Sequence, residues 1–252
     1  MYVAVSTESF LPAAGPAPPL AELCERAAET GFDKLELHLD EEYGPLKPSE
    51  IAAAPERFAA TYRDTSRLTP VAFCLAEDVP PSITAGLAKA AKHLKFAQLT
   101  VPASPLGTPF NDEVDRLKAH HAAASPEAVR VSVRTRAGEL SEDPDTAVQL
   151  CKAVKGLGVT FDPSYFVSGP YAEVDREALY RHIYHVQLRD TSHDRLQVKT
   201  GLGEIDYAKL MTRLQKEDYR GALAVDLLPE ETEKEERSLE LRKLRMLLET
   251  LL

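Results

Sequence analysis

Charged and strongly polar side chains recur at alternate positions of short apolar segments in the second half of the chain. They occur in VSVRTR (131–136), VTFD (159–162), HVQLRD (185–190) and ALAVD (222–226). Successive residues of a strand point to opposite faces, so Arg134, Arg136, Asp162 and Asp226 are predicted to share one face, with apolar neighbours on the other. The same inward phase is predicted for Gln98, Thr100, Ser132 and Thr160. Paired carboxylates can move protons as general acids and bases, and arginines bind anions. These residue types therefore predict a polar site where the segments meet.

The same alternation continues elsewhere. In KLELHLD (34–40) the three leucines take one face, and Glu36 and His38 take the other. In HVQLRD the polar phase holds His185, Gln187 and Arg189. Burying such groups costs several kcal/mol unless they pair with one another, a metal or a ligand. We therefore expect a functional pocket; the alternative is an internal salt-bridge network without a ligand.

Short apolar segments alternate with longer amphipathic ones from end to end, which predicts parallel strand–helix units. The expected strands are Tyr2–Ser6, Lys34–Asp40, Val71–Glu77, Ala97–Val101, Val129–Thr135, Val159–Asp162, His185–Asp190 and Ala222–Asp226. The expected helices are 20–30, Ser49–Arg67, Ile83–His93, Asp112–Ala123, Pro144–Lys155, Asp175–His182, Tyr207–Lys216 and about 232–252. Eight such units in 252 residues predict an α/β protein with one (β/α)8 TIM barrel over residues 1–252, its pocket at the carboxyl ends of the strands.

Composition narrows the function classes. The formal net charge is -10, and the lysines and arginines are interleaved with acids, which argues against a nucleic-acid partner. The three cysteines form no CxxC pair, which is typical of reduced thiols in a cytoplasmic protein. No apolar run reaches membrane length, so no membrane association is expected.

Five segments, in order and at barrel spacing, resemble the xylose-isomerase-like TIM-barrel family, which includes sugar phosphate isomerases and epimerases and the AP endonucleases. The segments are LAELCERAAETGFDKLELHL, TFDPSYF, HVQLRD, GLGEIDYAKLM and YRGALAVD. The resemblance implies isomerisation or epimerisation of a small sugar or sugar phosphate. An AP endonuclease would need more His and carboxylate ligands than these strand ends provide.

The resemblance also implies site residues. Family members that act on sugars hold Mn²⁺, Mg²⁺ or Co²⁺ between strands five and eight, and this places candidate metal ligands at Asp162, Gln187 and Asp226. Asp162 and Asp226 are then also the candidate acid and base for moving a proton next to a carbonyl. Glu36 and His38 resemble positions that line the substrate pocket.

The chain departs from the family pattern at the strand-five ligand, where Arg134 replaces the expected Glu. Two like unit charges about 4 Å apart repel by roughly 4 kcal/mol at an effective dielectric near 20, and a divalent ion doubles this. We therefore expect a degenerate metal site, in which Arg134 stands in for the metal and pairs with Asp162, Asp226 or both.

Two functions remain open. The first is a sugar or sugar-phosphate isomerase or epimerase; the second is a non-catalytic, metal-free barrel that binds an anionic metabolite. Candidate anion-binding residues near one rim are Arg134, Arg136, Arg189 and Lys199. Tyr165 either offers its hydroxyl to the substrate or caps the barrel, and His185 is either a substrate contact or a hydrogen-bonded interior histidine.

Overall fold

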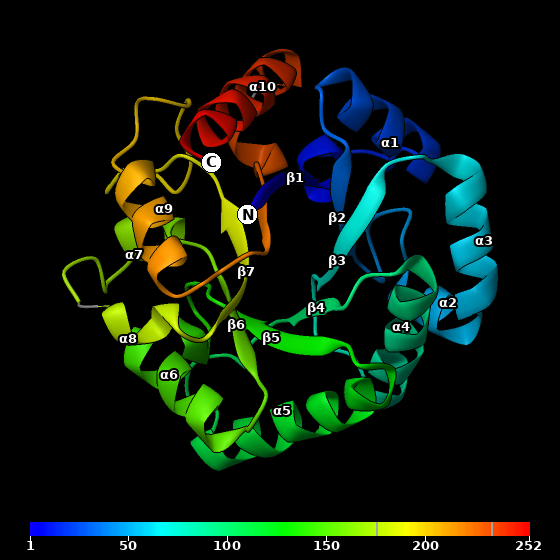
Figure 1. Cartoon of the computed structure of the whole chain (residues 1–252), viewed down its shortest axis with the longest axis horizontal. Helices are drawn as coiled ribbons and strands as arrows, with labels where there is room; N and C mark the ends of the chain where they lie inside the picture. Colours follow the sequence, from blue (N-terminus) through cyan, green and yellow to red (C-terminus); the bar gives the residue numbers. More distant parts are fainter. Residues whose placement is uncertain (175, 233) are drawn as a thin grey trace.

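Eight parallel strands close into a barrel in which each strand pairs with its sequence neighbours and β1 pairs with β8 (Figure 1). The computed structural model describes residues 1–174, 176–232 and 234–252. The strands are β1 (Tyr2–Ser6), β2 (Lys34–Leu39), β3 (Thr69–Leu75), β4 (Gln98–Val101), β5 (Arg130–Arg134), β6 (Gly158–Phe161), β7 (Ile183–Leu188) and β8 (Ala222–Val225). The predicted TIM barrel is confirmed.

Helices surround the barrel as an outer ring (Figure 1). They are α1 (Leu20–Glu29), α2 (Pro48–Ala53), α3 (Pro55–Thr65), α4 (Pro81–Leu94), α5 (Phe110–Ala124), α6 (Pro144–Ala153), α7 (Ser164–Val167), α8 (Glu177–Tyr180), α9 (Tyr207–Lys216) and α10 (Lys234–Leu251). Short 3₁₀ helices add η1 (Thr7–Phe10), η2 (Ser125–Glu127), η3 (Leu140–Glu142) and η4 (Pro229–Glu231).

Two predicted helices differ in detail. The segment Ser49–Arg67 is two helices, because Pro55 disfavours helical geometry at Ala54, where the chain breaks. The helix expected over Asp175–His182 is a single turn, α8, and its expected first residue, Asp175, lies outside the described residues. The last predicted helix, from about 232, likewise passes through Glu233, which lies outside the described residues.

The main core lies between the barrel and the helices. The leucines of β2 that alternate with Glu36 and His38 are fully buried on this side, as are Val131 and Val133 of β5. At Gly86 of α4, a Cβ atom would come within 2.6 Å of the Ala52 backbone of α2, so this close helix contact requires glycine. No helix in the described part of the chain is both long and apolar enough to span a bilayer.

Inside the barrel, a layer of uncharged polar groups lies two residues before the charged positions of β5 and β6. Thr160 Oγ1 lies 2.7 Å from Thr100 Oγ1 and 2.5 Å from Ser132 Oγ, which also accepts from Gln98 Nε2 at 2.6 Å. All four side chains are buried. We refer to Gln98, Thr100, Ser132 and Thr160 as the hydroxyl layer; it confirms the predicted inward phase of these strands.

Candidate functional site

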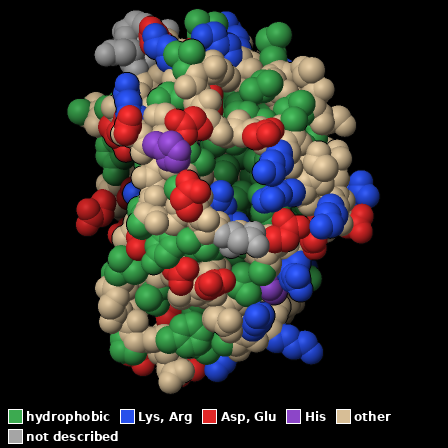
Figure 2. Space-filling view, turned by 90° about the vertical axis from the view of Figure 1, so that its left-hand side faces the viewer, with side chains coloured by type: hydrophobic (Ala, Val, Ile, Leu, Met, Phe, Trp, Pro, Cys, Tyr) green, Lys and Arg blue, Asp and Glu red, His purple; other side chains and the backbone are tan. Residues whose placement is uncertain are grey.

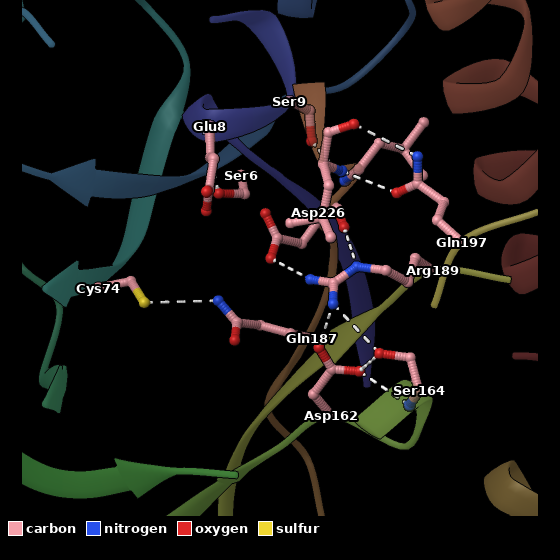
Figure 3. Close-up of polar contacts among 12 residues, drawn as sticks. Ser6, Glu8, Ser9, Cys74, Asp162, Ser164, Gln187, Arg189, Gln197 and Asp226 are labelled. Carbon is pink, nitrogen blue, oxygen red and sulfur yellow. Dashed lines mark hydrogen bonds and ion pairs between the residues drawn. The ribbon is translucent and has the colours of Figure 1, made fainter. Parts of the chain in front are cut away.

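The carboxyl ends of β6, β7 and β8 each place one charged side chain directly after the strand. Asp162 follows β6, Arg189 follows β7 and Asp226 follows β8. Arg189 lies between the two carboxylates (Figure 3): Nη1 is 2.7 Å from Asp162 Oδ2, and Nη2 is 2.7 Å from Asp226 Oδ2. The predicted meeting of Asp162 and Asp226 at the strand ends is therefore observed, with an arginine between them. We call these three residues the bridged centre.

The bridged centre is held by further contacts. Arg189 Nε donates to the Asp226 backbone carbonyl at 2.7 Å, and Nη1 donates to Ser164 Oγ at 3.1 Å. The Ser164 backbone N–H donates to Asp162 Oδ1 at 2.9 Å. Arg189 is only 2% exposed. Burial lowers the pKa of Arg189, but the two carboxylates raise it by more than burial lowers it. The pKa is therefore above the ordinary value, and the guanidinium stays charged.

Each aspartate has one buried carboxylate oxygen without a hydrogen-bond partner in the described part of the chain, Oδ2 in Asp162 and Oδ1 in Asp226. Asp162 Oδ2 lies in the ion pair with Arg189, whereas the ion pair of Asp226 uses its other oxygen, Oδ2. Burial raises the pKa of Asp226, the charges of Glu8 and Glu36 raise it further, and Arg189 opposes them, with a result of about 7. One oxygen of a buried carboxylate is therefore left without a protein partner.

Arg134 does not lie in the bridged centre. Its Nη2 is 3.0 Å from Glu139 Oε1 and donates to the Ala76 carbonyl at 3.0 Å, while Nη1 donates to the Leu75 carbonyl at 3.2 Å. The prediction that Arg134 pairs with Asp162 or Asp226 is wrong. The reason is strand order: β7 lies between β6 and β8, so an arginine at the end of β7 reaches both aspartates.

A second ion pair lies at the ends of β1 and β2. His38 Nδ1 is 3.1 Å from Glu8 Oε2, and the His38 backbone N–H donates to Thr7 Oγ1 at 2.9 Å. Burial lowers the pKa of His38, but Glu8, with smaller contributions from Asp226 and Glu36, raises it above the ordinary value. Burial likewise raises the pKa of Glu8, and His38, Arg189 and Arg134 together lower it to about 2. We call Glu8 and His38 the acid–imidazole pair.

Glu8 was not among the predicted site residues. It lies in η1, a single 3₁₀ turn after β1, where Ser6 Oγ accepts from the Glu8 backbone N–H at 3.3 Å. A turn of four residues has no periodicity that would indicate which side chains face the barrel. Its one sequence signal is its place directly after the first strand.

Glu36 forms a third cluster, deeper along β2. Its carboxylate contacts His185 Nε2 at 2.5 Å and accepts from Gln187 Nε2 at 2.8 Å. Gln187 Nε2 also lies 3.4 Å from Cys74 Sγ (Figure 3). Glu36 is fully buried and His185 is 2% exposed. The interior hydrogen-bonded alternative for His185 is thus the observed one, and the Gln187 amide nitrogen is directed to Glu36.

The remaining predicted residues lie in different surroundings. Tyr165 is half-buried in α7, with the Arg189 guanidinium 5.5 Å from its ring centroid, and burial raises its pKa. Arg136 was expected to face inward, but β5 ends at Arg134, the alternation stops there, and Arg136 is exposed. Lys199 is exposed and donates to Glu236 Oε1 at 2.8 Å. The four predicted rim cations therefore form no single cluster.

A cleft of about 1110 Å³ lies beside the loops that follow β1, β7 and β8. It is bounded by residues 11–18, 195–202 and 227–232 and by side chains of α1 and α10. Of the predicted site residues, only Lys199 lines it. On the face shown in Figure 2, acidic and basic side chains lie interspersed rather than in a basic stripe.

The donor set at the strand ends does not fit a divalent cation. Hard cations such as Mg²⁺ and Mn²⁺ need several anionic or carbonyl oxygens directed at one point. Among the described residues, no group of three or more His, Cys, Asp or Glu side chains could hold a metal ion. Asp162 and Asp226 both direct an oxygen at the Arg189 guanidinium, and Arg134 stands at the position of the expected carboxylate.

Comparison with known proteins identifies the family. The profile of the xylose isomerase-like TIM barrel family matches residues 24–245, so the chain belongs to this family. A comparison with curated protein sequences gives no match.

Solved structures share the fold over the whole chain. A D-tagatose 3-epimerase-like protein is 19% identical, with a TM-score of 0.70, covering 100% of this chain and 98% of that one. An L-ribulose 3-epimerase is 14% identical, with a TM-score of 0.73 and coverage of 100% and 96%. A xylose isomerase-like TIM barrel protein from Mycobacterium smegmatis in complex with magnesium is 15% identical, with a TM-score of 0.71 and coverage of 98% and 97%.

Proposed function

We propose that this chain catalyses isomerisation or epimerisation of a small sugar or sugar derivative by moving a proton next to a carbonyl, with Asp226 as the base and His38 as the acid. One observation carries the proposal: a buried aspartate oxygen without a hydrogen-bond partner lies near a histidine that is paired with an acidic neighbour, which raises the pKa of the imidazole. Family membership supports the reaction class.

Each group has one task in this proposal. Asp226 Oδ1 takes the proton from the carbon beside the carbonyl, and the electron pair of the C–H bond moves to form an enediol. The carbonyl oxygen receives a proton from the His38 imidazolium, which Glu8 orients through Nδ1. In isomerisation, Asp226 delivers the proton to the former carbonyl carbon, while the hydroxyl on the first carbon gives its proton back to neutral His38 and becomes the new carbonyl. In epimerisation, a solvent proton adds to the first carbon from the other face, the enol hydroxyl returns its proton to His38, and Asp226 releases the abstracted proton to solvent.

Asp162, predicted with Asp226 as a catalytic carboxylate, is assigned a positioning task. Its Oδ1 accepts from Ser164, and its Oδ2 lies in the ion pair with Arg189. Asp162 Oδ2 also lacks a hydrogen-bond partner but lies 2.7 Å from Arg189 Nη1, whereas Asp226 pairs with Arg189 through Oδ2 and its buried Oδ1 has no hydrogen-bond partner among the described residues. Asp162 orients Arg189, and Arg189 in turn orients Asp226.

For the substrate we propose a sugar acid or sugar phosphate. Arg136 is exposed two residues beyond the carboxyl end of β5, and its charge partly offsets the burial that raises the pKa of the Tyr165 hydroxyl. A guanidinium at this place can bind a carboxylate or phosphate through two parallel hydrogen bonds. The Tyr165 hydroxyl and His38 then take the hydroxyl and carbonyl groups of the same molecule.

The test is solvent proton exchange. Purified protein in D₂O with EDTA is incubated with neutral ketoses and with sugar acids and sugar phosphates, and deuterium incorporation is followed by NMR. We expect incorporation beside the carbonyl of an anionic sugar and its loss in Asp226→Asn and His38→Gln. His193→Gln, a change at an exposed histidine, is the matched control and keeps the rate. Equal rates in all four proteins, or no incorporation from any sugar, would contradict the proposal.

A non-catalytic binding protein is the second candidate. The observation in its favour is that Arg189 already neutralises both carboxylates that the resemblance implies as catalysts. In that case anionic sugars raise the melting temperature, Arg136→Ala abolishes the shift, and no deuterium enters any sugar.

A further inference from the structure

We propose that the Arg189 guanidinium is the permanent cation of the barrel, occupying the place where relatives can bind a divalent ion, so that this chain folds and binds its ligand without metal. The inference concerns how the two aspartates are neutralised. It therefore goes beyond the proposed proton transfer and can hold where that fails.

The geometry is that of a bridging cation. Two carboxylates from strands on either side of β7 each direct one oxygen at Arg189, both at 2.7 Å. These are the aspartates that the family resemblance marks as metal ligands. A divalent ion that contacts both Oδ2 atoms would have to occupy the space of the guanidinium, so arginine and metal exclude each other.

The guanidinium is also anchored against leaving. Nε donates to the Asp226 carbonyl at 2.7 Å, and Nη1 donates to Ser164 Oγ at 3.1 Å, so each of its three nitrogens has an acceptor. At 2% exposure, any other rotamer would leave buried acceptors unsatisfied and two buried carboxylates without a counter-charge. An incoming metal therefore competes with a fully paired side chain, not with water.

The surroundings offer no alternative set of three or more His, Cys, Asp or Glu ligands within the part of the chain that the structure describes. The third candidate ligand, Gln187, donates its amide hydrogens to Glu36 and Cys74. At the strand-five position, where a carboxylate is expected, Arg134 adds a second buried cation, paired with Glu139. A divalent ion here would face the Arg189 guanidinium and no more than the two carboxylates of the bridged centre.

The first experiment uses the wild-type chain. After dialysis against EDTA, elemental analysis and thermal unfolding are measured with and without Mn²⁺. We expect no bound metal and a melting temperature that changes by less than about 1 °C, because a ligand shifts stability only when its concentration exceeds its Kd. Stoichiometric Mn²⁺, or a clear loss of stability in EDTA, would overturn the inference.

The second experiment removes the cation. In Arg189→Met two carboxylates face a space of similar volume without the positive charge, so we expect Mn²⁺ to bind at least about tenfold more tightly than to wild type, seen by calorimetry and by Mn²⁺ electron paramagnetic resonance. Arg134→Met is the matched control: it also removes a buried arginine, but between Glu139 and two carbonyls, and should gain no Mn²⁺ affinity. No gain in folded Arg189→Met, or an equal gain in the control, would overturn the inference.

Arg189→Lys decides the matter should Arg189→Met not fold. Lysine keeps one charge but loses the two-pronged contact, so this variant should be folded, melt below wild type and bind no Mn²⁺. If Arg189→Lys gains Mn²⁺ affinity by the factor of about ten expected for Arg189→Met, the positive charge is not what excludes the metal, and the inference is contradicted. The deuterium-exchange assay is independent of these readouts, so failure of the proposed function and failure of this inference are distinguishable.

Discussion

The hydroxyl layer and the bridged centre lie two residues apart at β6, yet their buried polar groups are paired in different ways. In the hydroxyl layer, Thr160 bonds to neutral partners on the adjoining strands, and each group can turn to donate or accept. In the bridged centre, Ser164 donates to one oxygen of Asp162, but the charge of Asp162 is balanced by one arginine from the neighbouring strand. Losing a neutral partner removes about one neutral hydrogen bond, whereas losing the arginine leaves two buried carboxylates without a counter-charge. Stability should therefore be distributed unequally along the barrel axis.

The largest expected effect is on the bridged centre. Arg189→Met should lower the free energy of unfolding by about 3–5 kcal/mol, because breaking a buried ion pair leaves its partners without a counter-charge. Urea denaturation at neutral pH, without added metal, measures it. A loss below that of a single hydroxyl deletion would show that the carboxylates are neutralised by other means and would remove the contrast between the two layers.

The next effect concerns the acid–imidazole pair, whose charges lie at the rim and are partly solvated. Glu8→Gln should lower the free energy of unfolding by about 1.5–3 kcal/mol, the usual range for a hydrogen bond to a charged group. It should also lower the pKa of His38, which NMR titration of the imidazole resonances measures directly.

The pH dependence of this effect has a defined sign. Glu8 has a folded pKa of about 2 against an ordinary 4.5, so its stabilisation is present above pH 4.5 and is lost as the pH falls towards 2. His38 has a folded pKa raised above 6.5, so its stabilisation is present below pH 6.5 and is lost as the pH rises through the folded value. The difference between wild type and Glu8→Gln should be largest between pH 4.5 and 6.5. A difference that is constant with pH would mean that Glu8 acts by packing alone.

The hydroxyl layer should respond less. Ser132→Ala removes one hydroxyl from a buried network in which Thr100 and Thr160 still bond to each other at 2.7 Å. The expected loss is about 1 kcal/mol, the net worth of a neutral hydrogen bond. Urea denaturation under the conditions used for Arg189→Met makes the comparison direct. A loss as large as that of Arg189→Met would show that the network is cooperative and that charge is not the main difference.

The contrast between the layers also explains how far the sequence could predict the site. Alternation within a strand depends on the strand alone, so the barrel and the inward placement of Asp162 and Asp226 could be predicted. The partner of those aspartates depends on which strands are adjacent. Arg134 and Arg189 have the same residue type and the same inward phase, and only the order β6–β7–β8 assigns the aspartates to Arg189.

Other errors have equally local causes. Alternation along β5 predicts that Arg136 faces inward, but β5 ends at Arg134 and Arg136 is exposed. Glu8 lies in a four-residue turn without periodicity, so no pattern indicated that it would meet His38. Residues two or more positions beyond a strand end, and residues in single turns, are positioned by tertiary contacts, and the sequence carries little information about them.

The smallest effect should come from Lys199, because its ion pair carries full charges but is not buried. Its ion pair with Glu236 is 2.8 Å long, close to the 2.7 Å of the two buried Arg189 pairs, but its side chain is 55% exposed. Water and salt screen such a pair, and ordering two long side chains offsets most of the Coulomb attraction. Lys199→Ala should therefore leave the urea midpoint within measurement error at 0.15 M salt.

Because Lys199 lines the cleft of about 1110 Å³, the same variant also tests whether an anion binds there. If Lys199→Ala is as stable as wild type but loses the thermal shift produced by an anionic sugar, the binding site lies in the cleft and not beside Arg136. If the shift is retained, the anion binds outside the cleft, as proposed for Arg136.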